Sequence, residues 1–388
     1  MFILFLVTLV DMIGFGIIFP LLPMIKIKFA INDLQLGYLA SSFAFFGLIG
    51  SIFFGYLSDL IGRKIVLYVP VFLVALAYIY TAYANTFVEL IILRSVCGFL
   101  TGNLSVSFAS CADLSTPQNK LNNMGIVGAA FGIGFILGPF LGGITAGNSN
   151  DANLVNLEIP FLVAAFVSLL SGIIAVLFFK ETLLKEERVN DKNQNIIKLV
   201  LPLIMNKSFL FFMFLGTVVS IVFAGLEVYF GLWLNTLMSF TPQEIGLYWA
   251  SFAVAMTVFQ MTLNRFLSPK LALVLGFFGL SVALLGILLI TNIWFLVVIT
   301  LLMTMSMSVI LPSLNTNLSN IGAKNQQGLI FGINQSFGSL GRILGPYVLG
   351  ILYNINTNFT WIAVAMVCLL VALIVLRYFK HEHIDNPL

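Results

Sequence analysis

Apolar residues along this 388-residue chain gather into long stretches separated by short polar segments. An α-helix needs about 20 predominantly apolar residues to cross a bilayer. Twelve such stretches lie near 1–22, 36–57, 65–84, 88–112, 122–146, 159–179, 208–232, 244–265, 270–290, 293–318, 327–352 and 357–379. The alternating ten-residue segments typical of a membrane β-barrel are absent from the sequence. The pattern predicts an all-α polytopic membrane protein with twelve transmembrane helices.

Composition supports this prediction. Only 9% of the residues are charged and 60% are hydrophobic, whereas an average soluble domain has roughly 25% charged residues. The first stretch carries Asp11 at its centre and lacks a small-residue cleavage site, so we do not expect a cleaved signal peptide. Because the charges lie in loops, the net charge of +3 gives no sign of nucleic-acid binding. The apolar stretches make the lipid bilayer the expected partner, and no nucleic acid is expected.

The loop charges predict the orientation of the chain. Lysine and arginine are concentrated in alternate loops, and the opposite loops hold only Lys26 and Lys28. The positive-inside rule then places both termini and the long loop 181–207 in the cytoplasm. We expect a multi-pass protein of the cell membrane, in a bacterium the inner membrane. The charged loop is interpreted as a solvated linker, with a regulatory role left open.

Two halves of the chain are repeats. The segments Gly134–Ile144 and Gly341–Ile351 are identical at seven of eleven positions, at an offset of 207 residues. Six helices per repeat keep the repeats parallel, an arrangement typical of transporters whose site lies between the halves. We therefore predict an N-terminal bundle at 1–180, a cytoplasmic linker at 181–207, and a C-terminal bundle with a short cytoplasmic tail at 208–388.

The loop after the second stretch contains a motif. It reads Gly55-Tyr56-Leu57-Ser58-Asp59-Leu60-Ile61-Gly62-Arg63-Lys64, and it resembles the GxLxDxxGRK loop of the major facilitator superfamily. The resemblance implies the twelve-helix, two-bundle fold of that family. It also implies a cytoplasmic latch built from Gly55, Asp59, Gly62, Arg63 and Lys64, with Asp113 receiving Arg63. The alternative is an ordinary turn whose positive residues only set the topology.

Further motifs resemble one branch of this superfamily, the drug/proton antiporters. The fifth stretch carries Gly134, Gly138, Pro139, Gly142 and Gly143, and their spacing resembles the antiporter signature of proton-coupled drug exporters. The first stretch, with Asp11, is similar to the opening helix of tetracycline/proton antiporters and multidrug exporters. Arg94 stands in an RxxxG pattern of the same superfamily. Close packing between helices is the structural explanation of the glycines, because they remove side-chain bulk.

Four ionisable residues lie deep in apolar sequence, namely Asp11, Arg94, Glu227 and Arg342. Depths estimated at 1.5 Å per residue allow Asp11 to meet Arg94 and Glu227 to meet Arg342. Buried acids within spans commonly relay protons, so Asp11 and Glu227 are the candidates for proton coupling, with the arginines as charge partners. Purely structural ion pairs, and snorkelling of Arg94 to the interface, remain alternatives.

Polar and aromatic residues near the same depth are candidates for a substrate cavity. They are Asn103, Tyr229, Trp233, Asn315, Asn317, Asn334 and Gln335. Hydrogen bonds between helices explain any single amide of this set equally well.

These features together predict a function. We expect a monomeric secondary transporter that exports a small amphiphilic molecule in exchange for protons, with no cofactor and the proton gradient as energy source. A proton-coupled importer or facilitator of a metabolite or siderophore is the alternative. A membrane sensor would need a large soluble domain, which the short tail does not provide. The sequence has no P-loop, metal-ligand cluster or nucleophile–base arrangement, so it predicts neither an enzyme nor ATP-driven transport.

Overall fold

The computed structural model describes residues 1–116, 120–151, 154–183, 203, 205–321 and 327–385, and every element in this part of the chain is helical. Eleven helical segments there are long and apolar enough to cross a membrane. The remaining predicted span, 327–352, corresponds to α14, Gln327–Ile355, which has 29 residues. It is more polar than the others because it includes Asn334, Gln335 and Arg342. The protein is an all-α polytopic membrane protein, as predicted.

Six spans come from the first repeat. They are α1 (Phe2–Gly16) continued by η1 (Phe19–Leu21) and α2 (Leu22–Lys28), then α3 (Asp33–Ile61), α4 (Arg63–Ala82), α5 (Phe87–Thr101) continued by α6 (Leu104–Asp113), α7 (Lys120–Ala146) and α8 (Glu158–Phe178). The first span is interrupted where Pro20 and Pro23 remove backbone donors. Gly62 separates α3 from α4 at φ 109°, a conformation that glycine adopts without strain.

The second repeat supplies the other spans. They are α10 (Lys207–Met238), α11 (Pro242–Leu263), α12 (Pro269–Ile287), α13 (Ile293–Ser319), α14 and α15 (Thr357–Asp385). Several helices start at side-chain caps that satisfy otherwise unpaired backbone N–H groups. Asn32 and Gln35 form a capping box at the start of α3, and Ser268 caps α12.

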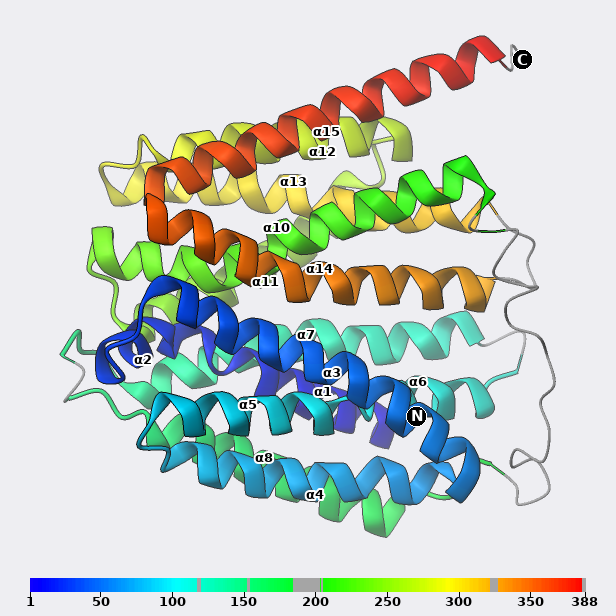
Figure 1. Cartoon of the computed structure of the whole chain (residues 1–388). Coiled ribbons are helices and arrows are strands. Elements are labelled where there is room, and N and C mark those ends of the chain that lie inside the picture. The colour runs from blue at the N-terminus through cyan, green and yellow to red at the C-terminus, as the bar shows by residue number, and fades with distance from the viewer. Residues whose placement is uncertain (117–119, 152–153, 184–202, 204, 322–326, 386–388) are drawn as a thin grey trace. The chain divides into compact units, whose positions relative to one another are not determined.

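The chain forms two compact units. The first comprises Met1–Gln194 together with Gly225–Ala250, and the second comprises Asn195–Ala224 with Ser251–Leu388. Within the first unit α1 packs on α7, and α4 lies beside α8, as Figure 1 shows. Within the second unit α12 packs between α13 and α15. The helix α10 contributes its first half to the second unit and its second half to the first.

The same glycine-mediated helix crossing occurs in each repeat. A Cβ built on Gly134 of α7 would lie 2.7 Å from the carbonyl oxygen of Leu9 in α1. At the equivalent place in the second repeat, a Cβ on Gly341 of α14 would lie 2.7 Å from the carbonyl oxygen of Thr217 in α10. Glycine is needed here because backbone atoms approach more closely than a side chain permits. The matched sequence segments therefore carry matched packing.

Candidate functional site

A cluster of buried polar side chains lies inside the first unit. Asp11 of α1 is 3% exposed and Arg94 of α5 is 2% exposed, while Thr8 of α1 and Tyr78 of α4 are equally buried. Atoms without a hydrogen-bond partner are Thr8 Oγ1, Asp11 Oδ2, Tyr78 Oη, and Nε and Nη1 of Arg94. Buried polar atoms are almost always paired in proteins, so an unpaired set points to function or to an alternative arrangement.

The expected direct ion pair between Asp11 and Arg94 is not present. The Arg94 guanidinium instead lies over the ring of Phe43 in α3, with 4.4 Å from its central carbon to the ring centroid. This cation–π contact is favourable in a desolvated site. Tyr78, which the sequence analysis did not single out, interacts electrostatically with both Asp11 and Arg94. The structure thus brings Asp11 and Arg94 into one cluster without joining them directly.

Glu227 and Arg342 lie in different units. Glu227 is 4% exposed and sits in the half of α10 that belongs to the first unit. Arg342 is half-buried on α14 in the second unit. Each of them interacts with other groups, and their mutual pairing stays a prediction.

The predicted cavity residues fall into three groups. Asn103 is fully buried and donates to the carbonyl oxygen of Leu67 in α4, so one of its bonds joins two helices. Tyr229 and Trp233 are buried in the first unit. In the second unit the Asn334 side chain reaches Asn315, at 3.5 Å between Nδ2 and Oδ1. Asn317 bonds to its own helix, and Gln335 is exposed.

The two buried aromatic residues have specific contacts. The Tyr229 hydroxyl donates to the carbonyl oxygen of Asp33 at 2.8 Å, and Trp233 stacks on Phe230 with centroids 5.4 Å apart. The Tyr229 bond joins α10 to α3, whereas the contact of Trp233 with Phe230 lies within α10. Their role as cavity lining stays a prediction.

The motif loop between α3 and α4 forms a charged cluster, which we call the latch cluster: Ser58, Asp59, Arg63, Asp113 and Glu181. Arg63 Nη1 lies 2.7 Å from Asp59 Oδ1, and Arg63 Nε lies 3.1 Å from Asp113 Oδ2. Arg63 Nη1 also donates to Ser58 Oγ. The expected contact of Arg63 with the acid at the end of α6 is present. Its action as a latch stays a prediction.

Glu181 was assigned to the linker by the sequence analysis, but it caps α4. Its carboxylate oxygens accept the backbone N–H groups of Arg63 at 2.8 Å and Lys64 at 3.2 Å. A carboxylate at this place satisfies unpaired N–H groups and complements the positive end of the helix dipole. The only sequence signal was an acid soon after the sixth span, which does not reveal a contact across more than a hundred residues.

Replacement of Arg63 tests the latch cluster. We expect Arg63→Ala to lower substrate turnover by about tenfold and to leave the dissociation constant of the substrate within about twofold. A charge-assisted hydrogen bond contributes about 1.5–3 kcal/mol, and the cluster lies at the end of the helices, far from the buried polar cluster. Turnover and equilibrium binding are measured on the same purified protein. Arg265→Ala, at an exposed arginine in the loop after α11, is the matched control. Equal losses of binding and turnover would contradict the prediction.

The contribution of Glu181 to the stability of the protein is expected to depend on pH. Partial burial opposes ionisation of this carboxylate, but four backbone N–H groups outweigh it, so the pKa of Glu181 lies below its usual value of 4.5. A group whose pKa is lowered by folding adds stability above its unfolded pKa and loses it as the pH falls through the folded pKa. We expect the melting temperature of Glu181→Gln to lie below that of wild type at pH 7. The difference should shrink as the pH falls below 4.5. A difference that grew at acid pH would contradict this assignment.

A second group of contacts lies at the opposite end of α3, within the first unit. Asn150, after α7, donates to the carbonyl oxygen of Ser239 at 2.6 Å and accepts from Asn235 at 2.9 Å. Thr241 donates to Asn148 at 2.7 Å. Gly143 of α7 and Gly246 of α11 approach so closely that a Cβ on either would lie 2.9 Å from the other's Cα. We call these contacts, which join the first repeat to the residues 235–246, the clasp.

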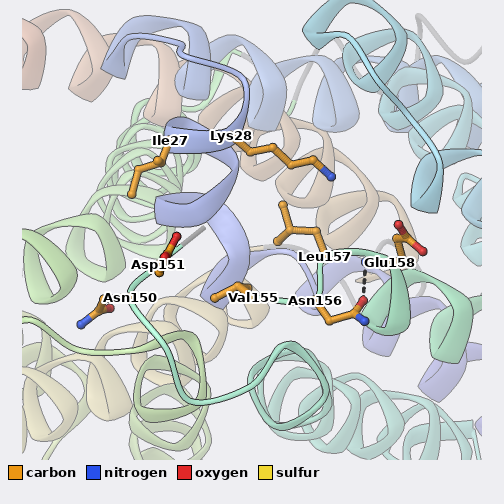
Figure 2. A pocket seen from close by; sticks show the side chains of 8 residues that line it. All are labelled: Ile27, Lys28, Asn150, Asp151, Val155, Asn156, Leu157 and Glu158. Carbon is orange, nitrogen blue, oxygen red and sulfur yellow. Dashed lines mark hydrogen bonds between the residues drawn. The ribbon is translucent and has the colours of Figure 1, made fainter. Parts of the chain in front are cut away.

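A pocket of about 640 Å³ lies beside the clasp (Figure 2). It is lined by Ile27, Lys28, Asn150, Asp151, Val155, Asn156, Leu157 and Glu158. Figure 2 shows Lys28 on α2 at one side of the pocket and the segment that leads from α7 to α8 at the other. None of the residues predicted for the substrate cavity lines this pocket.

Comparisons with known proteins agree with the fold. Residues 4–261 and 230–387 match the Major Facilitator Superfamily. Multidrug resistance protein 2 of Bacillus subtilis is 28% identical over 366 residues, which cover 91% of this chain and 88% of that protein. The quinolone resistance protein NorA of Staphylococcus aureus is 25% identical over 360 residues, which cover 92% and 90%.

Solved structures share the fold at low sequence identity. A bacterial homologue of the human lysosomal transporter Spinster, in an inward-facing and unoccupied conformation, has a TM-score of 0.81 at 14% identity and covers 98% of this chain and 97% of its own. The human organic anion transporter MFSD10 (TETRAN) has a TM-score of 0.70 at 22% identity, with coverages of 96% and 98%. The family match extends over nearly the whole chain, and so this multi-pass membrane protein belongs to the major facilitator superfamily of transporters.

Proposed function

We propose that this transporter is a proton-coupled antiporter that exports small amphiphilic, drug-like molecules by alternating access. The observation that carries the proposal is the buried carboxyl of Asp11, which has an oxygen without a hydrogen-bond partner inside a membrane-spanning bundle. A charged side chain in this position is costly unless it serves a function, and such acids commonly relay protons. The proton gradient is the energy source in this proposal.

Two further observations support export of drug-like molecules. The relatives that match over about nine tenths of the chain are named for multidrug and quinolone resistance. A second deeply buried acid, Glu227, lies in the first unit. Binding of a substrate near either acid would favour release of the proton from that acid. This linkage between substrate binding and proton release couples transport to the proton gradient.

Alternating access requires contacts that form and break. The clasp and the latch cluster lie at opposite ends of α3. The clasp joins the first repeat to residues of the second, and in this proposal it is the group of contacts that opens on its side of the membrane. The hydrogen bonds of the clasp involve neutral amides and hydroxyls, each with a small net contribution of about 0.5–1.5 kcal/mol. The contacts of the clasp therefore break at a small cost in free energy.

The proposed orientation places both termini in the cytoplasm of the cell. Asn150 and Lys180 lie beyond opposite ends of α8 and both are exposed. We expect a membrane-impermeant maleimide to label Asn150→Cys in intact cells and Lys180→Cys only after the membrane is opened. The reverse pattern would contradict the orientation.

A substrate screen tests the proposal. The purified protein is reconstituted in proteoliposomes with an imposed pH gradient, and amphiphilic dyes, quinolones and tetracyclines are compared with sugars and siderophores. Gradient-dependent accumulation of amphiphilic compounds is expected. Accumulation of a metabolite or siderophore alone would favour an importer on the same fold.

A further inference from the structure

We propose that Tyr78 is the positioning residue through which Arg94 sets the proton affinity of Asp11. This inference rests on the proposed role of Asp11 in proton coupling. Tyr78 belongs to α4, and its hydroxyl is seated directly over Gly14 of α1, where a built Cβ would overlap it. Gly14 stands three residues after Asp11, so the two share a face of α1 about one turn apart. The tyrosine hydroxyl therefore lies on the face of α1 that carries Asp11, about one turn away from this residue along the helix.

The unpaired atoms of the cluster are chemically complementary. Nε and Nη1 of Arg94 only donate hydrogen bonds, an ionised Asp11 only accepts them, and the Tyr78 hydroxyl does both. None of these atoms has a hydrogen-bond partner, and Tyr78 interacts electrostatically with both charged residues. A chain from the Arg94 N–H through the Tyr78 hydroxyl to Asp11 Oδ2 would satisfy all three, because a tyrosine hydroxyl accepts and donates at one atom.

Other ionisable groups do not offer this link. Cys97 of α5 is buried near Arg94 and Tyr78, but a thiol is a weak donor. Besides α3 and α4, which reach α1 through Phe43 and Tyr78, the helices packed on α1 are α6, α7 and α8. Their ionisable residues lie at or near the helix ends: Cys111 and Asp113 on α6, Lys120 on α7, and Glu158 on α8.

The proposed series of hydrogen bonds between Arg94, Tyr78 and Asp11 has two states. When Asp11 is ionised, the Tyr78 hydroxyl donates to its carboxylate and accepts from Arg94, which favours the charged acid. When Asp11 takes up a proton, its own O–H donates to the Tyr78 oxygen and the tyrosine proton turns away. Tyr78 stays un-ionised throughout, so only one proton is bound or released. Loss of the hydroxyl removes the stabilisation of the charged form, and Asp11 then keeps its proton to a higher pH.

Infrared titration of the purified protein tests the proposal without measuring transport. The carboxyl band of Asp11 is assigned by its loss in Asp11→Asn, and its titration midpoint is measured in wild type, Tyr78→Phe and Tyr80→Phe. Tyr80 lies two residues further on α4 and is 66% exposed, so it is the matched control. We expect Tyr78→Phe to raise the midpoint by about one pH unit, and Tyr80→Phe to leave it unchanged.

Gly14→Ala provides an independent variant, because it keeps Tyr78 but displaces the end of its side chain. It should raise the midpoint in the same direction, and the double variant should show no further shift. If Tyr78→Phe is not recovered as folded protein, Gly14→Ala alone carries the test. An unshifted midpoint in the recovered variant, or an Asp11 band that does not titrate in wild type, would overturn the proposal. Absence of proton-driven transport in wild type would instead overturn the proposed function, whatever the infrared result.

Discussion

Gly138→Val in α7 is expected to abolish transport, whereas Gly132→Val in the same helix is expected to leave it near the wild-type rate. A Cβ at Gly138 would lie 2.8 Å from the carbonyl oxygen of Ile13 and 3.0 Å from the Cα of Gly16. These are backbone atoms of α1, which cannot move away as the end of a side chain can. A Cβ at the exposed Gly132 meets nothing within 4 Å.

The size of the effect follows from overpacking. Extra carbon atoms in a well-packed site cost about 1–3 kcal/mol, and more when the backbone must shift. The yield of folded, monodisperse protein and the initial rate of substrate transport are measured for both variants. We expect Gly138→Val to lose at least about nine tenths of the transport rate per folded molecule. Similar rates for the two variants would show that the α1–α7 crossing is not required.

The second repeat allows the same comparison. Gly345 of α14 faces the backbone of Ile221 in α10, with the carbonyl carbon 3.1 Å from a built Cβ, while Gly332 meets nothing within 4 Å. Gly345→Val and Gly332→Val should therefore differ as the first pair does. If only the first pair differs, the two crossings are not functionally equivalent in spite of their matched sequences.

Asp11→Asn is expected to abolish substrate accumulation driven by a pH gradient while substrate exchange without a gradient continues. Asparagine has nearly the same shape as aspartate but neither binds nor releases a proton at this position. Accumulation should fall to the level of passive equilibration. Both activities are measured in the same proteoliposomes. Glu158→Gln, at an exposed acid at the start of α8, is the control and should accumulate substrate as wild type does.

Glu227→Gln distinguishes two roles for the second buried acid. If Glu227 carries a proton, the variant should retain exchange and lose accumulation. If Glu227 is only the charge partner of Arg342, removal of one charge leaves the other buried, so the variant should express poorly. The double variant with Arg342→Gln should then recover folding. Accumulation at wild-type rates in both Asp11→Asn and Glu227→Gln would show that neither acid carries the coupled proton.

The sequence was most informative where packing depends on residue size and order. The repeated glycine motifs indicated close packing between helices, because glycines remove side-chain bulk. The structure shows that the partners are α7 with α1 and α14 with α10. The resemblance of the charged loop to the GxLxDxxGRK motif implied the contact of Arg63 with Asp113, which the structure shows. Twelve apolar stretches gave the helices, since a bilayer fixes their length.

Contacts between side chains of distant helices were beyond the same reasoning. Estimated depth placed Asp11 and Arg94 at similar levels, but depth does not fix rotation about the helix axis, and Arg94 faces Phe43. Tyr78 lies in an apolar run where a tyrosine gives no periodic signal. Tyr229 looked available for a substrate, yet its hydroxyl is bonded to the backbone of Asp33. Glu181 caps a helix that starts 118 residues earlier.

The most direct test of proton antiport reverses the pH gradient across proteoliposomes while the membrane potential is clamped at zero. Ethidium or a fluorescent quinolone identified in the screen is supplied outside. Antiport predicts accumulation when the lumen is acidic, none when it is alkaline, and none in Asp11→Asn at either gradient. The result does not depend on the orientation of the inserted protein. Substrate accumulation driven by an alkaline lumen, or substrate entry at the same rate with either pH gradient, would contradict proton antiport.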